Sequence, residues 1–349
     1  MKTLNNLLTG VIGIVIAMLV GALFIKSQDN SPVQVYRALC DYGLGSWFSF
    51  SSTLNSATPL ILTGMSAAIA FSAGVINLGQ HGQFTVGALT AALLGVYLPL
   101  PGWIGIPVIL LVSGIAAGLW GVIAGLLKRF YRMNELITTL MLNFIAEYLA
   151  LYLAMYLFLD KSSYVPATKM VNSEFFIHSH NNLSMGFFIA IGMVVLSYVL
   201  VSHFKIGYEW RMMGHNLKFA RVGGCETDEN VIWIMIYTGF LSGLGGALLI
   251  LGGTQHRFMR GIAGNFGWDG IMLSIIGNSG VIATSLFAIF FGFLKAGGIG
   301  MEFETGVPSE FVLVLQAVIV LMVVSTRSII YFYGDRIRAR IKVREVVKG

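Results

Sequence analysis

Long apolar stretches alternate with short polar segments along almost the whole chain. Each stretch is bounded by charged residues, by proline, or by glycine mixed with polar residues. A helix needs about 20 residues to cross a bilayer, and inside lipid only helices and closed barrels satisfy their backbone polar groups. The stretches are too long and too continuous for barrel strands, so the pattern predicts an all-α integral membrane protein with about ten transmembrane helices. The expected spans are Leu7–Ile25, Ala57–Ala73, Val86–Leu98, Trp103–Leu127, Glu135–Leu159, Met185–Val201, Val231–Leu251, Trp268–Gly277, Val281–Phe293 and Glu310–Val324.

The composition agrees with a membrane protein and excludes an ordinary soluble domain. Of the 349 residues, 56% are hydrophobic and only 11% are charged. The 42 glycines fit closely packed transmembrane helices, in which small residues let backbones approach. The net charge of +6 arises from basic residues that cluster at the ends of the apolar stretches. The positive-inside rule explains such clusters, so no nucleic-acid partner is expected.

The basic clusters predict which ends of the spans face the cytoplasm. Both termini are expected inside, and the first span, Leu7–Ile25, is interpreted as a retained anchor. Residues 1–328 are expected to form one transmembrane domain, followed by a basic cytoplasmic tail over 329–349. Arg257 and Arg260 fit this topology least well, because their loop is placed outside. The three inside clusters lie at Lys128–Arg132, Lys205–Arg221 and Arg327–Lys348.

A polar, glycine-rich segment without charged residues, Gly74–Phe84, interrupts the second and third spans. Irregular backbone at membrane depth is tolerated only where protein or water covers it, which is typical of a substrate path. Asn77, Gln80 and Gln83 are therefore candidate pathway residues, with His81 beside them. The alternative is a plain cytoplasmic turn between two spans.

Further polar residues lie in the predicted spans or at their ends, where unpaired polar groups are costly. Glu135 and Asp269 begin helices, so each carboxylate could instead cap its helix or favour the helix dipole. Asn143 and Glu147 are four residues apart and share a helix face, and hydrogen bonding between helices would also explain them. The pathway candidates added here are Asn134, Glu135, Asn143 and Asp269.

Two glycine-rich segments, Thr63–Gly74 and Thr238–Leu249, begin alike and run in opposite directions under this topology. Their likeness suits an inverted repeat, which is common in transporters, although chance similarity is the alternative. The small residues of the second segment are spaced three and four apart and are expected to form a helix-packing face. The short stretches Trp268–Gly277 and Val281–Phe293 are either two spans or one re-entrant hairpin.

The sequence contains no familiar motif for catalysis or ATP binding. Ser-His-Asp, HExxH, CxxC and G-x-x-x-x-G-K-[ST] patterns are all missing, so the chain is not expected to be an enzyme or to hold ATP. His178 and His180 form an H-x-H pair without a third ligand at a suitable spacing, which favours a solvated loop over a metal site. No metal or cofactor is expected, and any ATP must be bound by a separate subunit.

The segment Phe204–Asn230 is too polar to enter a bilayer and is placed on the basic, cytoplasmic side. A continuous helix over Glu209–Val222 is expected there, with an apolar stripe that includes Trp210 and Ala220. This helix is either a surface for a partner or a solvated helix at the interface.

Three motifs resemble the permease subunits of bacterial ABC importers, in the group that includes the ribose, branched-chain amino acid and nucleoside permeases. INLGQHGQ, Ile76–Gln83, is similar to FNIGAEGQ of the nucleoside and simple-sugar branch. NELITTLMLNFIA, Asn134–Ala146, is similar to NEVITTLMLNYIA, and GWDGIMLSIIG, Gly267–Gly277, is similar to GFDGIAVALLG. The resemblance covers the chain in order from Thr63 to Arg327.

The same family has a cytoplasmic loop helix, like RAVGLNPEAARYAGI, that docks into a cleft of the ATPase. RMMGHNLKFARVGGC, Arg211–Cys225, resembles it, so the ATPase is expected to dock here. Lys218 stands where the family carries glutamate, which puts the detailed contact in doubt. The residues at matching positions are Arg211, Gly214, Asn216, Ala220, Arg221 and Gly224.

The resemblance implies the transmembrane permease of an ATP-driven, binding-protein-dependent importer in the bacterial cytoplasmic (inner) membrane. Its solute is expected to be a nucleoside or a related ribosyl or sugar-like compound, with riboflavin or another small solute as the alternative. The implied partners are ATP-binding subunits, a second permease that is a copy or a paralogue, an external substrate-binding protein and membrane lipid. An alternative of another class is an ion-coupled secondary transporter with Glu135, Glu147 and Asp269 as coupling carboxylates.

Overall fold

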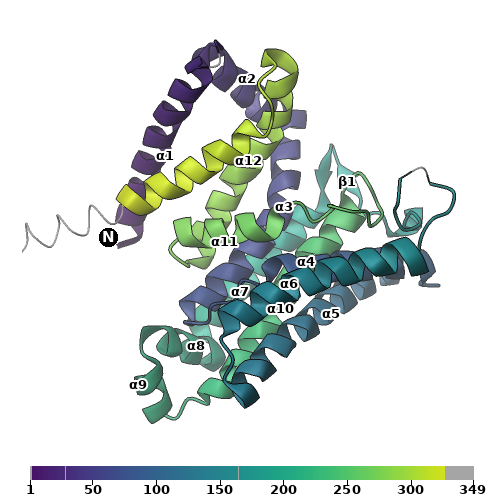
Figure 1. Ribbon diagram of the computed structural model, residues 1–349, viewed down its shortest axis with the longest axis vertical. Coiled ribbons are helices and arrows are strands. Elements are labelled where there is room, and N and C mark those ends of the chain that lie inside the picture. The colour runs from purple at the N-terminus through teal and green to yellow at the C-terminus, as the bar shows by residue number, and fades with distance from the viewer. Residues whose placement is uncertain (1, 28, 164, 327–349) are drawn as a thin grey trace, which may run out of the picture. The chain divides into compact units, whose positions relative to one another are not determined.

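The computed structural model describes residues 2–27, 29–163 and 165–326 of the chain (Figure 1). The chain divides into two compact units, one formed by residues 43–296 and the other by the two chain ends, 1–42 and 297–349. Each unit is described by itself. The expected tail at 329–349 lies outside the described residues.

The described residues form an all-α membrane protein with short connections. Within them, six helices are long and apolar enough to cross a membrane, or up to seven if the bent pair Ile12–Ser27 and Pro32–Leu44 forms one span. Every predicted span falls largely on a helix, but the expected number of crossings and the side of the termini stay predictions. The six are α3 (Trp47–Ser72), α5 (Gly102–Tyr131), α6 (Glu135–Tyr152) continued by the π-helical turn η1 (Leu153–Leu157), α7 (Met185–His203), α10 (Thr227–Gly252) and α12 (Val281–Thr305).

Helix α10 is the centre of the larger unit, where it packs against α3, α5 and α4 (Gln80–Tyr97). Its glycines allow backbone contact: a Cβ on Gly246 would lie 2.2 Å from the Phe84 carbonyl oxygen, and one on Gly243 would lie 2.2 Å from Ala117 Cβ. The expected small-residue packing face is therefore confirmed. Its close contacts bring α4 and α5 onto α10 without intervening side chains.

Helices α3 and α10 pack side by side in opposite directions. Ser66 Oγ donates to the Thr238 carbonyl oxygen at 2.8 Å and accepts from Ser242 Oγ at 2.9 Å. A Cβ on Gly245, further along α10, would lie 3.4 Å from Leu62 Cβ, earlier on α3. The segments Thr63–Gly74 and Thr238–Leu249 thus run antiparallel, and their relation as an inverted repeat stays a prediction.

Two boundaries in the last third of the chain differ from expectation. Helix α11 (Phe266–Ile276) has 11 residues and a length of about 16 Å, about half the thickness of a bilayer core. Helix α12 continues to Thr305, past its expected end at Phe293. The glycines after Phe293 suggested a loop but serve as packing positions, since a Cβ on Gly297 would lie 2.4 Å from the Leu39 carbonyl oxygen.

The loops of the larger unit gather at two ends. At one end, the segment over 158–184 pairs with the α10–α11 loop: Val171 N donates to the His256 carbonyl oxygen at 2.8 Å. This segment also holds η2 (Ser173–Phe175) and the antiparallel strands β1 (Ser179–His180) and β2 (Leu183–Ser184). Ser162 donates its hydroxyl and its backbone N–H to Asp160 Oδ1, which lowers the pKa of that carboxyl. Two loops expected outside therefore lie together.

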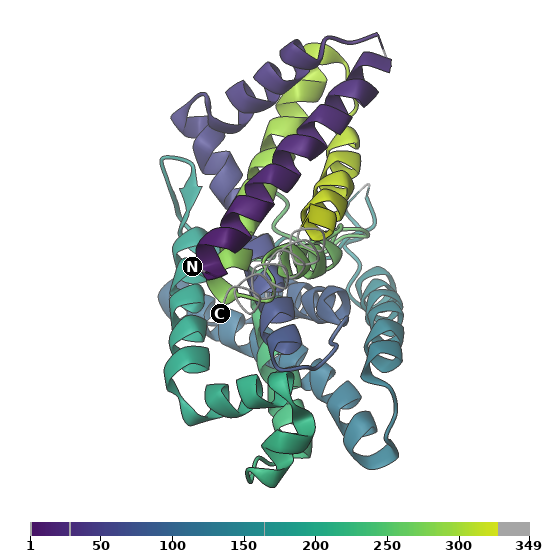
Figure 2. The same ribbon diagram turned by 90° about the vertical axis from the view of Figure 1, so that its left-hand side faces the viewer.

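The other end of the larger unit carries α8 (Lys205–His215) and α9 (Leu217–Val222), close to the C-terminal end of α5 (Figure 2). Arg129 Nη2 at that end of α5 lies 3.5 Å from Glu229 Oε1 in the first turn of α10. The two basic clusters expected inside, 128–132 and 205–221, thus lie at one end of the unit.

The smaller unit contains α1 (Lys2–Ser27), α2 (Pro32–Leu44) except for its last two residues, the end of α12 and a helix over Phe311–Thr326. Phe24 and Phe311 stack with ring centroids 5.7 Å apart. Tyr36 Oη donates to the Met18 carbonyl oxygen at 2.6 Å. The first contact joins α1 to the last described helix, and the second joins α2 to α1.

Candidate functional site

The break between α3 and α4 is held by amide side chains. Asn77 is fully buried: its Oδ1 accepts from Gly79 N at 2.8 Å, and its Nδ2 donates to Thr238 Oγ1 at 3.0 Å. The same Nδ2 lies 3.5 Å from Gln83 Oε1. The break is therefore covered by protein, and the Asn77 and Gln83 side chains contact groups within the protein.

Helix α6 provides hydrogen-bond partners for three further backbone groups of the break. Asn143 Oδ1 accepts from Gly82 N and its Nδ2 donates to the Leu78 carbonyl oxygen, both at 2.8 Å. Thr139 Oγ1 accepts from Leu78 N at 3.1 Å. Because a buried backbone group without a partner costs about 1–3 kcal/mol, these bonds let irregular backbone persist inside the helix bundle.

Asn134 and Glu135 lie at the start of α6. Asn134 Oδ1 accepts from Leu136 N at 2.9 Å, so Asn134 is the N-cap. Glu135 Oε1 accepts from Lys128 Nζ at 2.5 Å across the loop that joins α5 to α6. Both residues also line a polar groove of about 710 Å³ at the end of the unit that carries α9.

Gln80 and Asp269 are buried close to the centre of the larger unit. The amide atoms of Gln80 have no hydrogen-bond partner among the described residues, although its side chain is fully buried. Asp269 is 1% exposed, and its Oδ2 lies 2.7 Å from Lys295 Nζ of α12. Lys295 also lies over the Phe266 ring, 4.5 Å from its centroid, a cation–π arrangement. Asp269 is thus an ion-paired carboxylate, and not merely a helix cap.

Lys295 is a residue that sequence reasoning missed. It is the only basic residue between Arg260 and Arg327, and it interrupts an apolar stretch. An isolated charge within apolar sequence calls for a partner of opposite sign. That signal, together with the isolated Asp269, could have predicted the pair.

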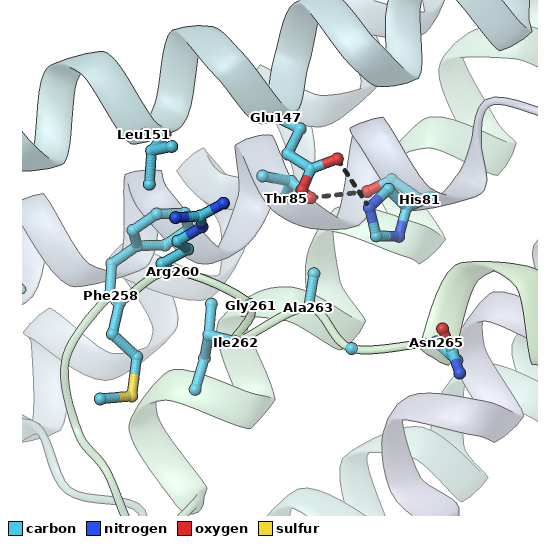
Figure 3. A pocket seen from close by; sticks show the side chains of 12 residues that line it. His81, Thr85, Glu147, Leu151, Phe258, Arg260, Gly261, Ile262, Ala263 and Asn265 are labelled. Atoms are coloured by element: carbon cyan, nitrogen blue, oxygen red, sulfur yellow. Dashed lines mark hydrogen bonds and ion pairs between the residues drawn. The ribbon is translucent and has the colours of Figure 1, made fainter.

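A cavity of about 160 Å³ opens beside His81, in the first turn of α4 and next to the break (Figure 3). We call it the His81–Glu147 cavity. His81 Nε2 lies 3.8 Å from Glu147 Oε2, and the His81 ring stacks on Trp268 with centroids 6.2 Å apart. The lining residues are His81 and Thr85 of α4, Glu147 and Leu151 of α6, and Phe258–Asn265 of the α10–α11 loop.

The polar loop forms two helices, so the expected continuous helix over Glu209–Val222 is wrong. The chain is extended at Asn216, with φ −159° and ψ 105°, and Asn216 Oδ1 accepts from Phe219 N at 3.0 Å. Asparagine at an N-cap favours such a break, because its side chain satisfies a backbone N–H that has no partner within the helix. Arg221 Nη2 donates to Thr227 Oγ1 at 2.9 Å and to Asp228 Oδ1 at 3.4 Å, which fixes α9 against α10.

Gly214 brings α8 into backbone contact with the end of α3. A Cβ on Gly214 would lie 1.9 Å from the Ser72 carbonyl oxygen, so no side chain fits there. Ala220 is fully buried, Arg211 Nη2 donates to the Ser202 carbonyl oxygen at 3.4 Å, and Gly224 has φ +85°. The six expected coupling residues thus contribute to the shape of the loop. The large apolar side chains that α9 exposes are Leu217, Phe219 and Val222.

The polar groove combines basic and acidic side chains from four helices and one loop, and Glu135 is the contribution of α6. The α5 end and the following loop supply Lys128, Arg129 and Arg132, whereas Arg221 comes from α9 and Asp228 from α10. Leu217 of α9 lines the same groove. Within the described part of the chain, no cluster of three or more His, Cys, Asp or Glu side chains is placed to hold a metal ion.

Comparison with known proteins agrees with this architecture. The chain is 31% identical to the guanosine ABC transporter permease protein NupP of Bacillus subtilis over 95% of its length and 97% of the relative's. It is 28% identical to the glucose ABC transporter permease protein TsgB13 of Haloferax volcanii, over 91% of its length and 87% of the relative's. The probable riboflavin import permease protein RfuC of Treponema pallidum is 26% identical over 75% of this chain and 71% of its own.

No solved structure matches the chain at a comparable level of significance. The family model described as branched-chain amino acid transport system / permease component matches residues 49–324, which includes the break, the His81–Glu147 cavity, both loop helices and the polar groove. The chain therefore belongs to this family of transport permeases.

Proposed function

We propose that this chain is the permease subunit of an ATP-driven, binding-protein-dependent importer of nucleosides or a related ribosyl or sugar-like solute. Support for the solute class comes from relatives whose names include guanosine, glucose and nucleoside. The single structural observation behind the proposal is the clamped break, in which the side chains of α6 and α10 hold irregular backbone inside the bundle. Such breaks occur where a membrane protein forms a solute site.

The importer we propose has about ten spans, both termini in the cytoplasm and a location in the bacterial inner membrane. It pairs with a second permease, a copy or a paralogue, and with two ATP-binding subunits. An external binding protein delivers the solute. The permease itself carries no ATPase site and no cofactor, so the ATP-binding subunits supply the free energy that separates its two access states.

The ATP-binding subunits dock on α8 and α9 in this proposal. The exposed Leu217, Phe219 and Val222 offer an apolar surface, and Lys218 adds a positive charge where the family pattern has a negative one. A displacement of α8 is then transmitted to the end of α3, next to the break, through the backbone contact at Gly214. Residues of the break and its neighbours, including Gln80 and Asp269, line or support the pathway.

An alternative solute is riboflavin, supported by the relative named as a riboflavin permease. Riboflavin and guanosine have different ring systems, although each carries a ring N–H beside a carbonyl. Competition in uptake separates the two solutes. A secondary transporter coupled to ions is a weaker alternative. The carboxylates that it would need are Glu135, which is ion-paired to Lys128, Asp269, which is ion-paired to Lys295, and Glu147.

The experiment that tests the function is uptake into proteoliposomes that contain this permease, its ATP-binding subunits and its second permease. We expect uptake of labelled nucleosides to require both ATP and the binding protein. Riboflavin and D-glucose serve as competitors. Uptake by the permease alone, driven by an ion gradient, would contradict the proposal.

A further inference from the structure

The carboxylate of Glu147 lies where lipid cannot cover it. Glu147 stands 12 residues after Glu135, about 18 Å along a helix of 23 residues, and therefore close to the middle of the span. Its side chain is 53% exposed. A charged carboxylate facing hydrocarbon costs about 3 kcal/mol, so this face of α6 must border water, protein or solute.

The carboxylate also has free hydrogen-bonding capacity. An ionised carboxylate has several acceptor positions, and the 3.8 Å to His81 Nε2 is too long for a hydrogen bond. His81 Nδ1 is buried and has no hydrogen-bond partner among the described residues. Thr85 differs, because its hydroxyl donates to the His81 carbonyl oxygen at 2.8 Å. The cavity therefore offers an occupant the acceptor positions of the Glu147 carboxylate and one edge of the His81 imidazole.

The remaining walls limit the shape of an occupant. Leu151, Phe258, Ile262 and Ala263 present apolar surface, and Arg260 enters from the loop (Figure 3). A cavity of about 150 Å³ holds a benzene-sized ring, so the 160 Å³ here suit one ring. A sugar ring carries hydroxyls on all sides, and several would face the apolar walls without partners. A flat ring whose polar groups lie on one edge avoids that cost.

We propose that the His81–Glu147 cavity is a substrate subsite that takes the edge of a planar nitrogen heterocycle where an N–H donor adjoins a carbonyl. Glu147 accepts from the ring N–H, and Arg260 donates to the carbonyl oxygen. Trp268 holds the His81 ring against the opening through their stacking contact. The subsite rests on the proposed import of nucleosides and names the part of the solute that the permease contacts.

Inosine and adenosine test this assignment because they have nearly the same size and differ at that edge. Inosine carries a ring N–H beside a carbonyl, whereas adenosine carries a ring acceptor beside an amino group. Equilibrium dialysis of the purified importer complex, without binding protein, gives the Kd of each nucleoside. We expect the wild-type complex to bind inosine about tenfold or more tightly than adenosine, as for one hydrogen bond to a charged group.

Glu147→Gln removes the charge and places an amide donor in the cavity, so the preference for inosine should fall to about onefold or reverse. Glu147→Asp retains the charge but withdraws the carboxylate, and should give an intermediate preference. Glu174→Gln, at an exposed position of η2, is the matched control and should keep the wild-type ratio. An unchanged ratio in both Glu147 variants would overturn the subsite, as would a wild-type complex that binds neither nucleoside or does not distinguish them.

The outcome for the proposed function is separate. ATP- and binding-protein-dependent nucleoside uptake with an unchanged ratio overturns the subsite alone. A ratio that collapses in Glu147→Gln, in a complex that imports no nucleoside, supports the cavity as a heterocycle site and overturns the proposed function.

Discussion

Two sets of polar side chains lie next to the same break, and they differ in whether they form hydrogen bonds within the protein. In one set, the amide groups of Asn77 and Asn143 form hydrogen bonds with backbone atoms of the break and with Thr238 of α10. On the cavity side, His81 and Glu147 face each other without a hydrogen bond. The polar residues around the break thus divide into a structural set, Asn77 and Asn143, which is hydrogen-bonded within the protein, and a free set, His81 and Glu147, whose facing atoms are too far apart for a hydrogen bond.

The comparison also bears on which polar groups can describe the solute. The amide of Asn77 is buried and hydrogen-bonded on both of its polar atoms, so it belongs to the scaffold around the break. The groups that remain unpaired include a carboxylate and an imidazole, which favour a different kind of ligand edge. Three substitutions can break or sharpen the distinction, and they follow in order of expected effect on stability.

The largest effect is expected for Asp269→Asn, which leaves the buried end of Lys295 without its counter-ion. Removing one partner of a buried ion pair costs about 3–5 kcal/mol, so the thermal unfolding midpoint in detergent should fall clearly. Asp269 is 1% exposed and Lys295 Nζ lies 2.7 Å away, which is the geometry of a buried pair.

The double variant Asp269→Asn with Lys295→Met is the control for this pair. It removes both charges, and it should recover at least half of the loss because no unpaired charge remains buried. A single variant as stable as wild type would show that water or another group already satisfies Lys295, and would place Asp269 in the free set.

A loss of about 3 kcal/mol is expected for Asn143→Leu, because Gly82 N and the Leu78 carbonyl oxygen both lose their partner. The amount of folded protein in the membrane and the unfolding midpoint both report this loss. Glu147→Leu, one helical turn further on, is the matched comparison and should leave the midpoint nearly unchanged. Equal losses in the two variants would remove the distinction between the structural and the free set.

The smallest effect is expected for Gln80→Met. Gln80 is buried and its amide atoms have no hydrogen-bond partner among the described residues, so an apolar side chain of similar size should change stability by less than about 1 kcal/mol. If Gln80 contacts solute during transport, uptake falls while the midpoint stays. A midpoint that drops as far as that of Asn143→Leu would assign Gln80 to the structural set.

Much of the fold could be predicted from apolar periodicity and small-residue spacing. The spans fall on helices because continuous apolar sequence can satisfy its backbone in lipid in few ways. The small-residue face of α10 could be predicted because the close approach of two helix backbones requires small residues such as glycine and serine at helical spacing. The extension of α12 was missed because glycines that pack against another helix look, in sequence, like glycines of a loop.

The candidate site was harder to predict because a sequence does not show which polar groups find partners. Asn143 and Glu147 share a helix face, yet one is 2% exposed and the other has a half-exposed side chain. The break at Asn216 did carry a signal, since asparagine is a preferred N-cap residue. The apolar stripe over 209–222 continues across Asn216, so the apolar pattern alone did not indicate that one helix ends there and another begins.

The contact of Gly214 with Ser72 has a mechanical consequence for the whole protein. Side chains between two helices can change rotamer and absorb part of a displacement, whereas two touching backbones have no such freedom. At this point α8 and α3 meet with no side chain of Gly214 between them. If the ATP-binding subunits dock on this loop as proposed, a displacement of α8 therefore reaches the end of α3 directly, and the conformational change at the break should follow the movement of α8 closely in time.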